Sequence, residues 1–509
     1  MKHLKRSTKI ALGIVFSVFV SSVTQAADNS DIQKQLDALE QQVRILQHKL
    51  EVSDENSAKA KKDNAILTGS DKGFGLKSSD GEFELKLRGL IQMDVRDFRE
   101  GIKGQPTGAI PNLLTSDASD NYLIRRARPI IEGTFNEIYG FRISPDFGGS
   151  TTTLIDAYVE GNYAPYGKVR AGKFAPPLGI GCLQSSAETK FNELSLASDL
   201  FPSRDVGIQL SGDLWLGTLS VVNYTVGIFN GANDDTNGDN SDVNSDKELE
   251  ARLFSQPFIN GYRFLQGFGL GVATSSYNAE GGPGNTGLSK YKTIGQEDFF
   301  TFRSDTVTVA STNPVTTDSV STVYLDGKRN RLIPQFDYFF NNFGLLGEYV
   351  DESEDITRYR STGIPQVPNV GNHTEELNNR AWSLTAAWTI TGEVQSLSAI
   401  KPTRNFDPAR DSWGAWELVV RKSELTIDKD AFEVNGVLGD TNSLAEATKS
   451  AQSANDIGVG VNWYLNKVVR ISLDYDKTTF KWGGGGVPAT APLDRPDEEV
   501  LIARVQASF

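Results

Sequence analysis

Residues 83–96 read FELKLRGLIQMDVR, a stretch in which apolar and polar side chains alternate with the single exception of Leu90. Strands of globular proteins usually span about 5–6 residues, whereas strands that cross a membrane span about 9–11. The alternation therefore has two interpretations. In a water-soluble sandwich the charged face would point to solvent. In a membrane barrel it would line a wet lumen, and the apolar face would meet lipid.

The rest of the chain favours the barrel. Segments with the same two-residue period recur to the C-terminus, and tight turns alternate with long polar loops between them, as is typical of outer-membrane barrels with an even number of strands. We count sixteen segments: 82–97, 121–136, 138–148, 154–163, 167–174, 205–213, 217–230, 247–256, 262–276, 331–341, 342–352, 379–391, 412–425, 456–465, 467–480 and 498–509. The sequence thus predicts an all-β fold, a sixteen-stranded antiparallel transmembrane β-barrel over residues 82–509.

Composition agrees with this fold class. Only 38% of the 509 residues are hydrophobic, the mean hydropathy is -0.34, and no long apolar run follows the N-terminal region, which excludes a bundle of membrane-spanning helices. The last strand has apolar residues at every second position from Leu501 and ends in Phe509, as outer-membrane barrels do. The formal net charge of -14 argues against nucleic acid as a partner.

The N-terminal region predicts three further segments. Residues 1–26 combine a basic start, a short apolar core and small residues before Ala27, which indicates a signal peptide that is removed on export. Residues 27–52 predict a helix and residues 53–81 a polar linker. The helix repeats apolar residues at spacings of four and three, and we interpret it as a short coiled coil that holds protomers together. The alternative is a helix packed on its own barrel. The seam comprises Ile32, Leu36, Leu39, Val43, Leu46 and Leu50.

Other chemistry finds little support. Cys182 is the only cysteine, and the exported chain would keep two histidines, His48 and His373, so neither a zinc site nor a Ser-His-Asp arrangement is easily built. Residues 233–238 resemble the start of a calcium loop, but Asn244 stands where a glutamate ligand belongs, so we interpret them as a solvated surface loop. We expect no catalytic residue, no cofactor and no metal site.

Several motifs resemble the phosphate-selective porin O/P family. They are YLIRRARP (122–129), PDFGG (145–149), DAY (156–158), RAGKFAPP (170–177), RDVGIQ (204–209), GAWEL (414–418) and GVNWYL (460–465). The resemblance covers most of residues 82–509 apart from the long loops. It implies a sixteen-stranded barrel, a homotrimer and a third loop, roughly residues 175–203, folded into the pore. Phosphate-specific relatives resemble one another in a lysine cluster at the pore neck, whereas here Lys190 is the one lysine of that loop.

Strand parity predicts which charges face the lumen. Arginine binds phosphate oxygens in bidentate fashion and stays charged, so rings of Arg and Lys favour anions. One basic wall could be formed by four arginines from neighbouring strands: Arg126, Arg128, Arg142 and Arg170. Acidic residues of the same parity could instead neutralise them across strands. The candidate pore-lining and anion-binding residues are Lys86, Arg88, Arg96, Arg126, Arg128, Arg142, Arg170, Lys173 and Lys190.

These features predict a passive channel for small hydrophilic solutes in the outer membrane of a Gram-negative cell, embedded in lipid and assembled as a homotrimer. The charge pattern leans towards anions, and the resemblance suggests phosphate or polyphosphate as the solute. Two alternatives stay open. One is a general, non-selective porin. The other is an outer-membrane barrel enzyme, against which the scarcity of histidine counts.

Overall fold

The computed structural model describes residues 29–63, 65–70, 73–100, 120–149, 151–164, 167–215, 220–234, 245–282, 286–304, 306–308, 318–360, 372–438, 443–485 and 492–509. The chain divides into two units, residues 1–65 and 66–509. Helix α1 (Asn29–Asp63) belongs to the first unit. Among the described helices, none has the length and apolar character needed to cross a membrane. The expected signal peptide lies outside the described residues.

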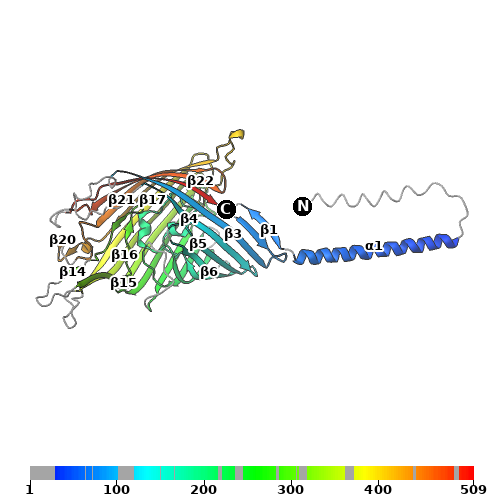
Figure 1. The fold of residues 1–509 in the computed structure, drawn as a ribbon, viewed down its shortest axis with the longest axis horizontal. Helices are drawn as coiled ribbons and strands as arrows, with labels where there is room; N and C mark the ends of the chain where they lie inside the picture. Colours follow the sequence, from blue (N-terminus) through cyan, green and yellow to red (C-terminus); the bar gives the residue numbers. More distant parts are fainter. Residues whose placement is uncertain are drawn as a thin grey trace. The chain divides into compact units, whose positions relative to one another are not determined.

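The second unit is a closed antiparallel β-barrel (Figure 1). Each strand pairs with its neighbours in the chain, and the last strand pairs with the first barrel strand, which closes the sheet. Its sixteen strands are β3 (Phe83–Glu100), β4 (Asn121–Phe135), β5 (Tyr139–Asp146), β6 (Thr153–Ala164), β7 (Gly167–Phe174), β8 (Asp205–Trp215), β9 (Val221–Phe229), β10 (Glu248–Gln256), β11 (Phe268–Glu280), β15 (Asp318–Phe340), β16 (Phe343–Arg360), β17 (His373–Thr389), β18 (Ala415–Thr426), β21 (Ala451–Tyr464), β22 (Val469–Trp482) and β23 (Glu498–Ser508). The predicted fold class is confirmed, and each of the sixteen expected segments corresponds to one barrel strand.

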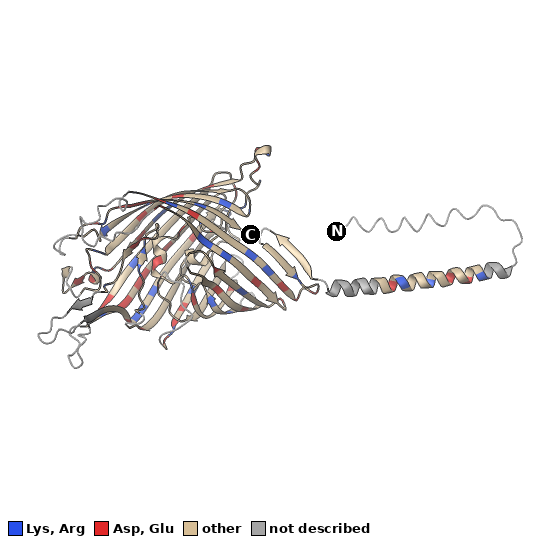
Figure 2. Cartoon of the chain, viewed as in Figure 1, with Lys and Arg blue, Asp and Glu red and all other residues tan. Residues whose placement is uncertain are grey.

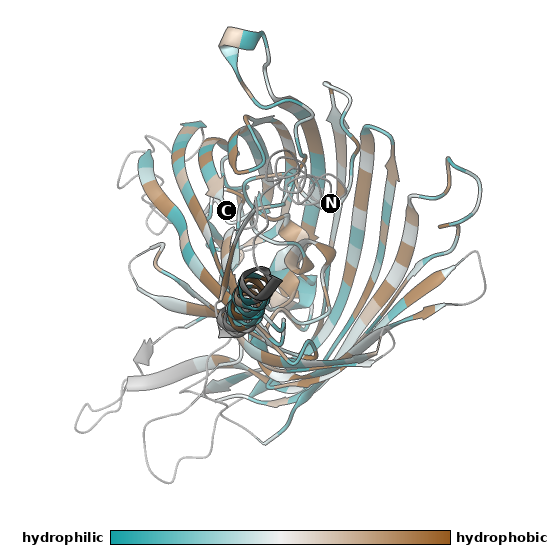
Figure 3. Ribbon diagram, turned by 90° about the vertical axis from the view of Figure 1, so that its right-hand side faces the viewer, coloured by the Kyte–Doolittle hydropathy of each residue, from teal (hydrophilic) through white to brown (hydrophobic). Residues whose placement is uncertain are grey.

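The two-residue period sorts side chains between lipid and lumen. On β3, Ile91 and Met93 are exposed on the outer surface, whereas Gln92, Asp94 and Arg96 are buried inside. Figure 3 shows this alternation as hydrophobic and hydrophilic bands along the strands. The barrel is therefore inverted relative to a soluble protein, with its polar residues in the interior and its apolar residues on the outside.

The region before the barrel differs from the expected polar linker over residues 53–81. Helix α1 continues to Asp63, because residues 57–63 (SAKAKKD) are rich in alanine and lysine, which favour helix. Strands β1 (Ile66–Ser70) and β2 (Gly73–Lys77) then form a hairpin, and β2 pairs with the start of β3. The apolar residues of β2 lie opposite the apolar residues of β3, which explains this register: Phe74 faces Leu87 and Leu76 faces Leu85.

Barrel closure places the C-terminal residue against the first strand. Gly89 N–H donates to the Phe509 carbonyl at 2.7 Å, and Phe509 N–H donates to the Gly89 carbonyl at 3.0 Å. The Phe509 ring lies directly over Gly89, so that a Cβ added there would come within 2.5 Å of the ring. Glycine at this position thus provides the space that the terminal aromatic side chain occupies.

Candidate pore constriction

The connection between β7 and β8, residues 175–204, folds into the lumen; we call it loop 3. It contains helix α2 (Ile180–Leu183) and the 3-10 helix η1 (Leu196–Leu200). Inward-facing side chains from many strands donate hydrogen bonds to its backbone carbonyls. These bonds run from Gln92 to Ser186, from Gln506 to Ala187, from Arg470 to Thr189, from Asn462 to Lys190, from Arg504 to Asn192 and from Arg421 to Glu193. Loop 3 is therefore fixed inside the barrel by the wall itself.

Lys190 and Lys173, which we expected to bind anions in the pore, are both buried. Lys190 is only 4% exposed, and its Nζ lies 3.0 Å from Glu417 Oε1 and 2.8 Å from Gln395 Oε1. The ion pair neutralises the Lys190 charge and anchors loop 3 to β18. Lys173, at the end of β7, is also buried. Neither lysine lines the cavity that lies between loop 3 and β4.

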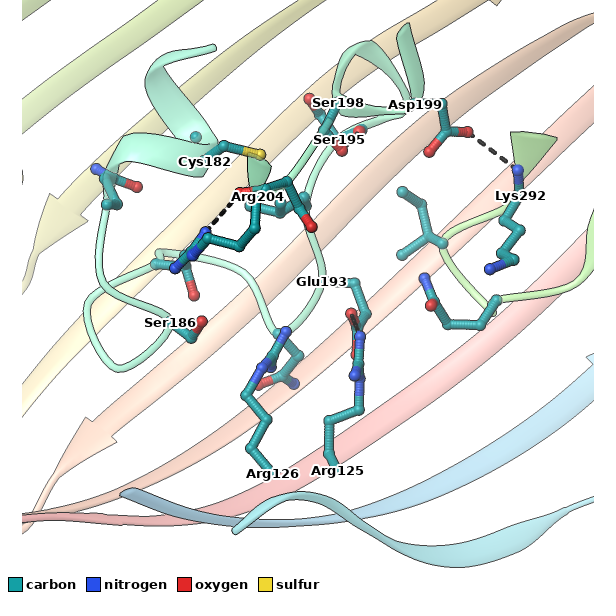
Figure 4. A pocket seen from close by; sticks show the side chains of 18 of the residues that line it. Arg125, Arg126, Cys182, Ser186, Glu193, Ser195, Ser198, Asp199, Arg204 and Lys292 are labelled. Carbon is teal, nitrogen blue, oxygen red and sulfur yellow. Dashed lines mark hydrogen bonds and ion pairs between the residues drawn. The ribbon is translucent and has the colours of Figure 1, made fainter. Parts of the chain in front are cut away.

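A β-bulge in β4 points two successive arginines into the lumen. Gln92 of β3 pairs with Arg126 and Met93 pairs with Ile124, so Arg125 is an extra residue in β4. Such a bulge interrupts the alternation by one position. Consequently the side chains of Arg125 and Arg126 both reach the region beside loop 3 (Figure 4).

Glu193 of loop 3 binds three of the arginines. Arg125 contacts it through two nitrogens, at 2.7 and 2.9 Å, while Arg96 Nη2 lies at 2.8 Å and Arg504 Nη2 at 3.0 Å. Burial alone would raise the pKa of Glu193, but Arg125, followed by Arg504 and Arg126, lowers it, and the resulting pKa is well below the usual value. The carboxylate therefore stays ionised and ties the loop to the arginines.

Most of the arginines predicted to face the lumen form ion pairs with acidic residues. For them, the alternative in which wall charges neutralise one another across strands applies. The closest contacts are Arg88 with Glu132 at 3.4 Å, Arg128 with Asp146 at 2.6 Å, Arg142 with Asp156 at 3.2 Å and Arg170 with Glu160 at 2.9 Å. Lys86 similarly lies 3.2 Å from Glu84.

Neutralisation is nevertheless incomplete. Eight arginines on this side of the lumen share six carboxylates, and Arg126 lies beside them, so the nine arginines exceed the carboxylates by three formal charges; we call this set the arginine wall. It comprises Arg88, Arg96, Arg125, Arg126, Arg128, Arg142, Arg170, Arg204 and Arg504, with Asp94, Glu132, Asp146, Asp156, Glu160 and Glu193. Figure 2 shows the density of charged positions along the strands.

Arg126 is the member of the wall without a carboxylate contact among the described residues. Its Nη1 donates to Gln92 Oε1 at 2.8 Å, and its Nε has no hydrogen-bond partner within the part of the chain that the structure describes. A guanidinium carries five donors and a full charge. Arg126 thus keeps donor capacity and charge that face the lumen.

A cavity of about 320 Å³ lies between the arginine wall and loop 3 (Figure 4). Its basic lining residues are Arg125, Arg126, Arg128, Arg204 and Lys292, and its acidic ones are Glu193 and Asp199. Lys292 belongs to the short strand β12 (Tyr291–Lys292), in the connection between β11 and β15, and its backbone N–H donates to Asp199 at 3.0 Å. Serine and threonine side chains of loop 3 line the opposite side, so the cavity is polar and mainly basic.

The sequence analysis did not predict three of the basic lining residues, Arg125, Arg204 and Lys292. Strand parity placed Arg126 and Arg128 in the lumen; the same two-residue period would put Arg125 on the lipid face, where a charge is costly. Two adjacent arginines in a membrane strand are themselves a signal of a bulge, since one of them would otherwise face lipid. Arg204 and Lys292 lie in or beside loops, where a two-residue period predicts nothing.

A closed sixteen-stranded barrel with an apolar exterior, a charged lumen and an inward-folded third loop defines an outer-membrane porin. Residues 85–481 match the family described as phosphate-selective porin O and P, and the chain belongs to that family. It is 22% identical to Porin O of Pseudomonas aeruginosa over 431 residues, which cover 80% of this chain and 85% of that protein. The protein is accordingly a channel of the Gram-negative outer membrane.

Solved structures of other outer-membrane proteins resemble it more distantly. The channel DcaP of Acinetobacter baumannii is 12% identical, with a TM-score of 0.47, over 86% of this chain and 99% of that one. OmpT of Vibrio cholerae is 8% identical, with a TM-score of 0.45, over 84% and 99% of the two chains.

Proposed function

We propose that this porin conducts small hydrophilic solutes by passive diffusion with a preference for anions, and that phosphate or polyphosphate is among its solutes. The observation that carries the proposal is Arg126, a lumen-facing guanidinium without a carboxylate contact among the described residues, at a cavity with five basic and two acidic lining residues. Anions are stabilised at such a site because the lumen screens charge less effectively than bulk water.

The size of the cavity supports a small solute. Its volume of about 320 Å³ lies at the lower end of the range of ligand pockets, about 300–1,000 Å³. Arg126 and Arg128 can present paired N–H groups to phosphate oxygens, and the hydroxyls of Ser186, Ser195 and Ser198 line the same space. A tetrahedral oxyanion fits this donor set in both charge and hydrogen bonding.

The test is a planar-bilayer recording of reversal potential under a salt gradient, with phosphate added as a blocker of chloride current. Arg126→Gln should move the reversal potential towards cations and weaken the phosphate block. Arg170→Gln is the matched control, since it removes the same charge from a residue that is paired with Glu160 and lies outside the cavity lining. An unchanged reversal potential in Arg126→Gln would favour a general porin without ion preference.

We further propose that the mature protein begins near residue 27 and that α1 assembles protomers into a homotrimer. The seam residues Leu36, Leu39, Val43, Leu46 and Leu50 are exposed in the single chain, and isolated helices gain little from such an apolar stripe. Burial between copies would remove this surface from water. Analytical ultracentrifugation of the purified porin, with and without residues 29–63, tests the assembly.

A further inference from the structure

A second charged cluster lies on the other side of the lumen, away from the arginine wall. Strands β10, β15 and β16 contribute Glu248, Glu250, Arg329, Arg331, Glu352 and Glu354 to it. Asp234, in the connection between β9 and β10, completes the cluster. Carboxylates outnumber guanidiniums here, the reverse of the arginine wall.

Three of these carboxylates converge. One oxygen each from Asp234, Glu352 and Glu354 lies within 4.8 Å of the other two. The residues are 4%, 1% and 1% exposed, so bulk water does not screen their mutual repulsion. Three oxygens at this separation are close enough to bind one cation, because Ca²⁺ binds oxygen at about 2.3–2.6 Å.

Neighbouring donors hold one oxygen of each carboxylate. Arg331 bonds Asp234 Oδ1 through Nη2 and Glu352 Oε1 through Nε, the latter at 2.9 Å. Asn379 Nδ2 donates to Glu354 Oε1 at 3.0 Å. Donors that orient a carboxylate through one oxygen and leave the other for an ion are typical of metal sites.

The second oxygen of Glu352 is an independent indication of a missing partner. Glu352 Oε2 is buried and has no hydrogen-bond donor among the described residues, although a buried carboxylate oxygen normally has one. Both oxygens of Glu250, which is 2% exposed on the neighbouring β10, also have none. Glu352 belongs to the converging group, so a cation bound there would supply a partner of the kind that its Oε2 lacks among the described residues.

The local charge requires compensation as well. Five carboxylates, counting Glu248 and Glu250, face two guanidiniums, those of Arg329 and Arg331, which leaves a formal excess of three negative charges. Burying uncompensated charge is strongly unfavourable. Either protons or a cation must neutralise part of this excess.

We infer that Asp234, Glu352 and Glu354 bind a divalent cation of the Ca²⁺ class. Oxygen ligands exclude soft metals, and three carboxylates from two separate segments suit the flexible coordination of Ca²⁺ better than the strict octahedron of Mg²⁺. The ion would join the loop after β9 to the barrel wall. Arg331 would extend the connection to loop 3, because its Nε also donates to the Leu200 carbonyl at 2.7 Å.

The experiment uses the folded, full-length porin in detergent after treatment with EDTA. Thermal unfolding is followed while CaCl₂ is added, up to about 10 mM, since extracellular calcium modules bind at about 0.1–1 mM. The melting temperature should rise and then saturate. Tb³⁺ gives a direct readout on the wild-type protein. Tyr291 is buried and interacts electrostatically with all three carboxylates, so it can sensitise the luminescence of a Tb³⁺ ion bound there.

Glu354→Gln is the test variant, because Asn379 can still bond the amide oxygen and Glu354 forms no ion pair within 4 Å among the residues that the structure describes. It should weaken Ca²⁺ binding at least tenfold in both measurements. Glu498→Gln is the matched control, since it replaces an equally buried glutamate on β23, outside the charged cluster, and should leave the affinity within twofold of wild type. The proposal is overturned by a melting temperature that does not respond to Ca²⁺, by one that responds only to lower pH, or by equal weakening in both variants.

Discussion

Replacing Glu193 by glutamine should loosen loop 3 and strengthen anion preference at the same time. In the wild type this one carboxylate accepts bonds from Arg125, Arg96 and Arg504. Arg96 and Arg504 keep Asp94 as a second partner, whereas Arg125 loses its closest one. The charge imbalance at the cavity lining changes from five against two to five against one.

The magnitude of the effect follows from these contacts. Removing one partner of a buried ion pair costs about 3–5 kcal/mol, and we expect the lower end because the Arg125 side chain is 27% exposed and can partly rehydrate. Two charges about 4 Å apart interact by about 1 kcal/mol in water and about 4 kcal/mol near a protein surface. Screening in a wet lumen favours the smaller figure, which corresponds to about a fivefold change in relative anion permeability.

Single-channel recording separates the two consequences, since reversal potential reports selectivity and closing events report loop mobility. Glu188→Gln is the control, because Glu188 lies in the same loop and has no ion pair among the described residues. Unchanged gating together with an unchanged reversal potential in Glu193→Gln would refute the reasoning. In the wild type, the contacts of Glu193 with the arginines should persist in mild acid, because its pKa in the folded protein is lowered. Their stabilisation is present above about pH 4.3 and is lost only as the pH falls through the lower folded-state pKa.

Three further outcomes are expected. Gly89→Leu should impair barrel closure, because its side chain would occupy the space of the Phe509 ring; the heat-modifiable band on a gel measures the folded fraction. Met93→Arg, on the lipid face, should destabilise the barrel by about 2–4 kcal/mol in urea titrations, whereas Thr134→Arg on the lumen side should cost far less. Deleting residues 29–63 should leave an inserted, conducting barrel in a bilayer assay, since the barrel hydrogen bonds lie in the other unit; failure to insert would contradict this separation.

The barrel could be predicted from sequence because lipid imposes a two-residue period on every strand that crosses it. The predicted strand bounds were less accurate where a strand has no apolar face for lipid. Strand β15 begins at Asp318 rather than at the expected residue 331. Its first part includes the polar run DGKRN (326–330), whose composition shows no apolar face. Without lipid on one side, a strand carries no alternation to detect.

The constriction was harder to predict because it depends on contacts between distant segments. Parity correctly directed Arg126 and Arg128 to the lumen. It could not find the bulge at Arg125, and it gave no indication that Lys190 would pair with Glu417, which lies far away in the sequence. Which lumen charges remain unpaired is decided by how loop 3 folds against the wall, and no local pattern encodes that fold.

The pairing of Phe509 with Gly89 has a consequence for the order of synthesis. The first barrel strand is complete early in translation, but its hydrogen-bonding partner β23 is the last of the sixteen barrel strands to be made. A truncated chain therefore retains two open sheet edges, which cannot persist in lipid because unpaired backbone groups are too costly there. Closure therefore depends on β23, and only a chain that includes this last strand can close the barrel and remain in the membrane.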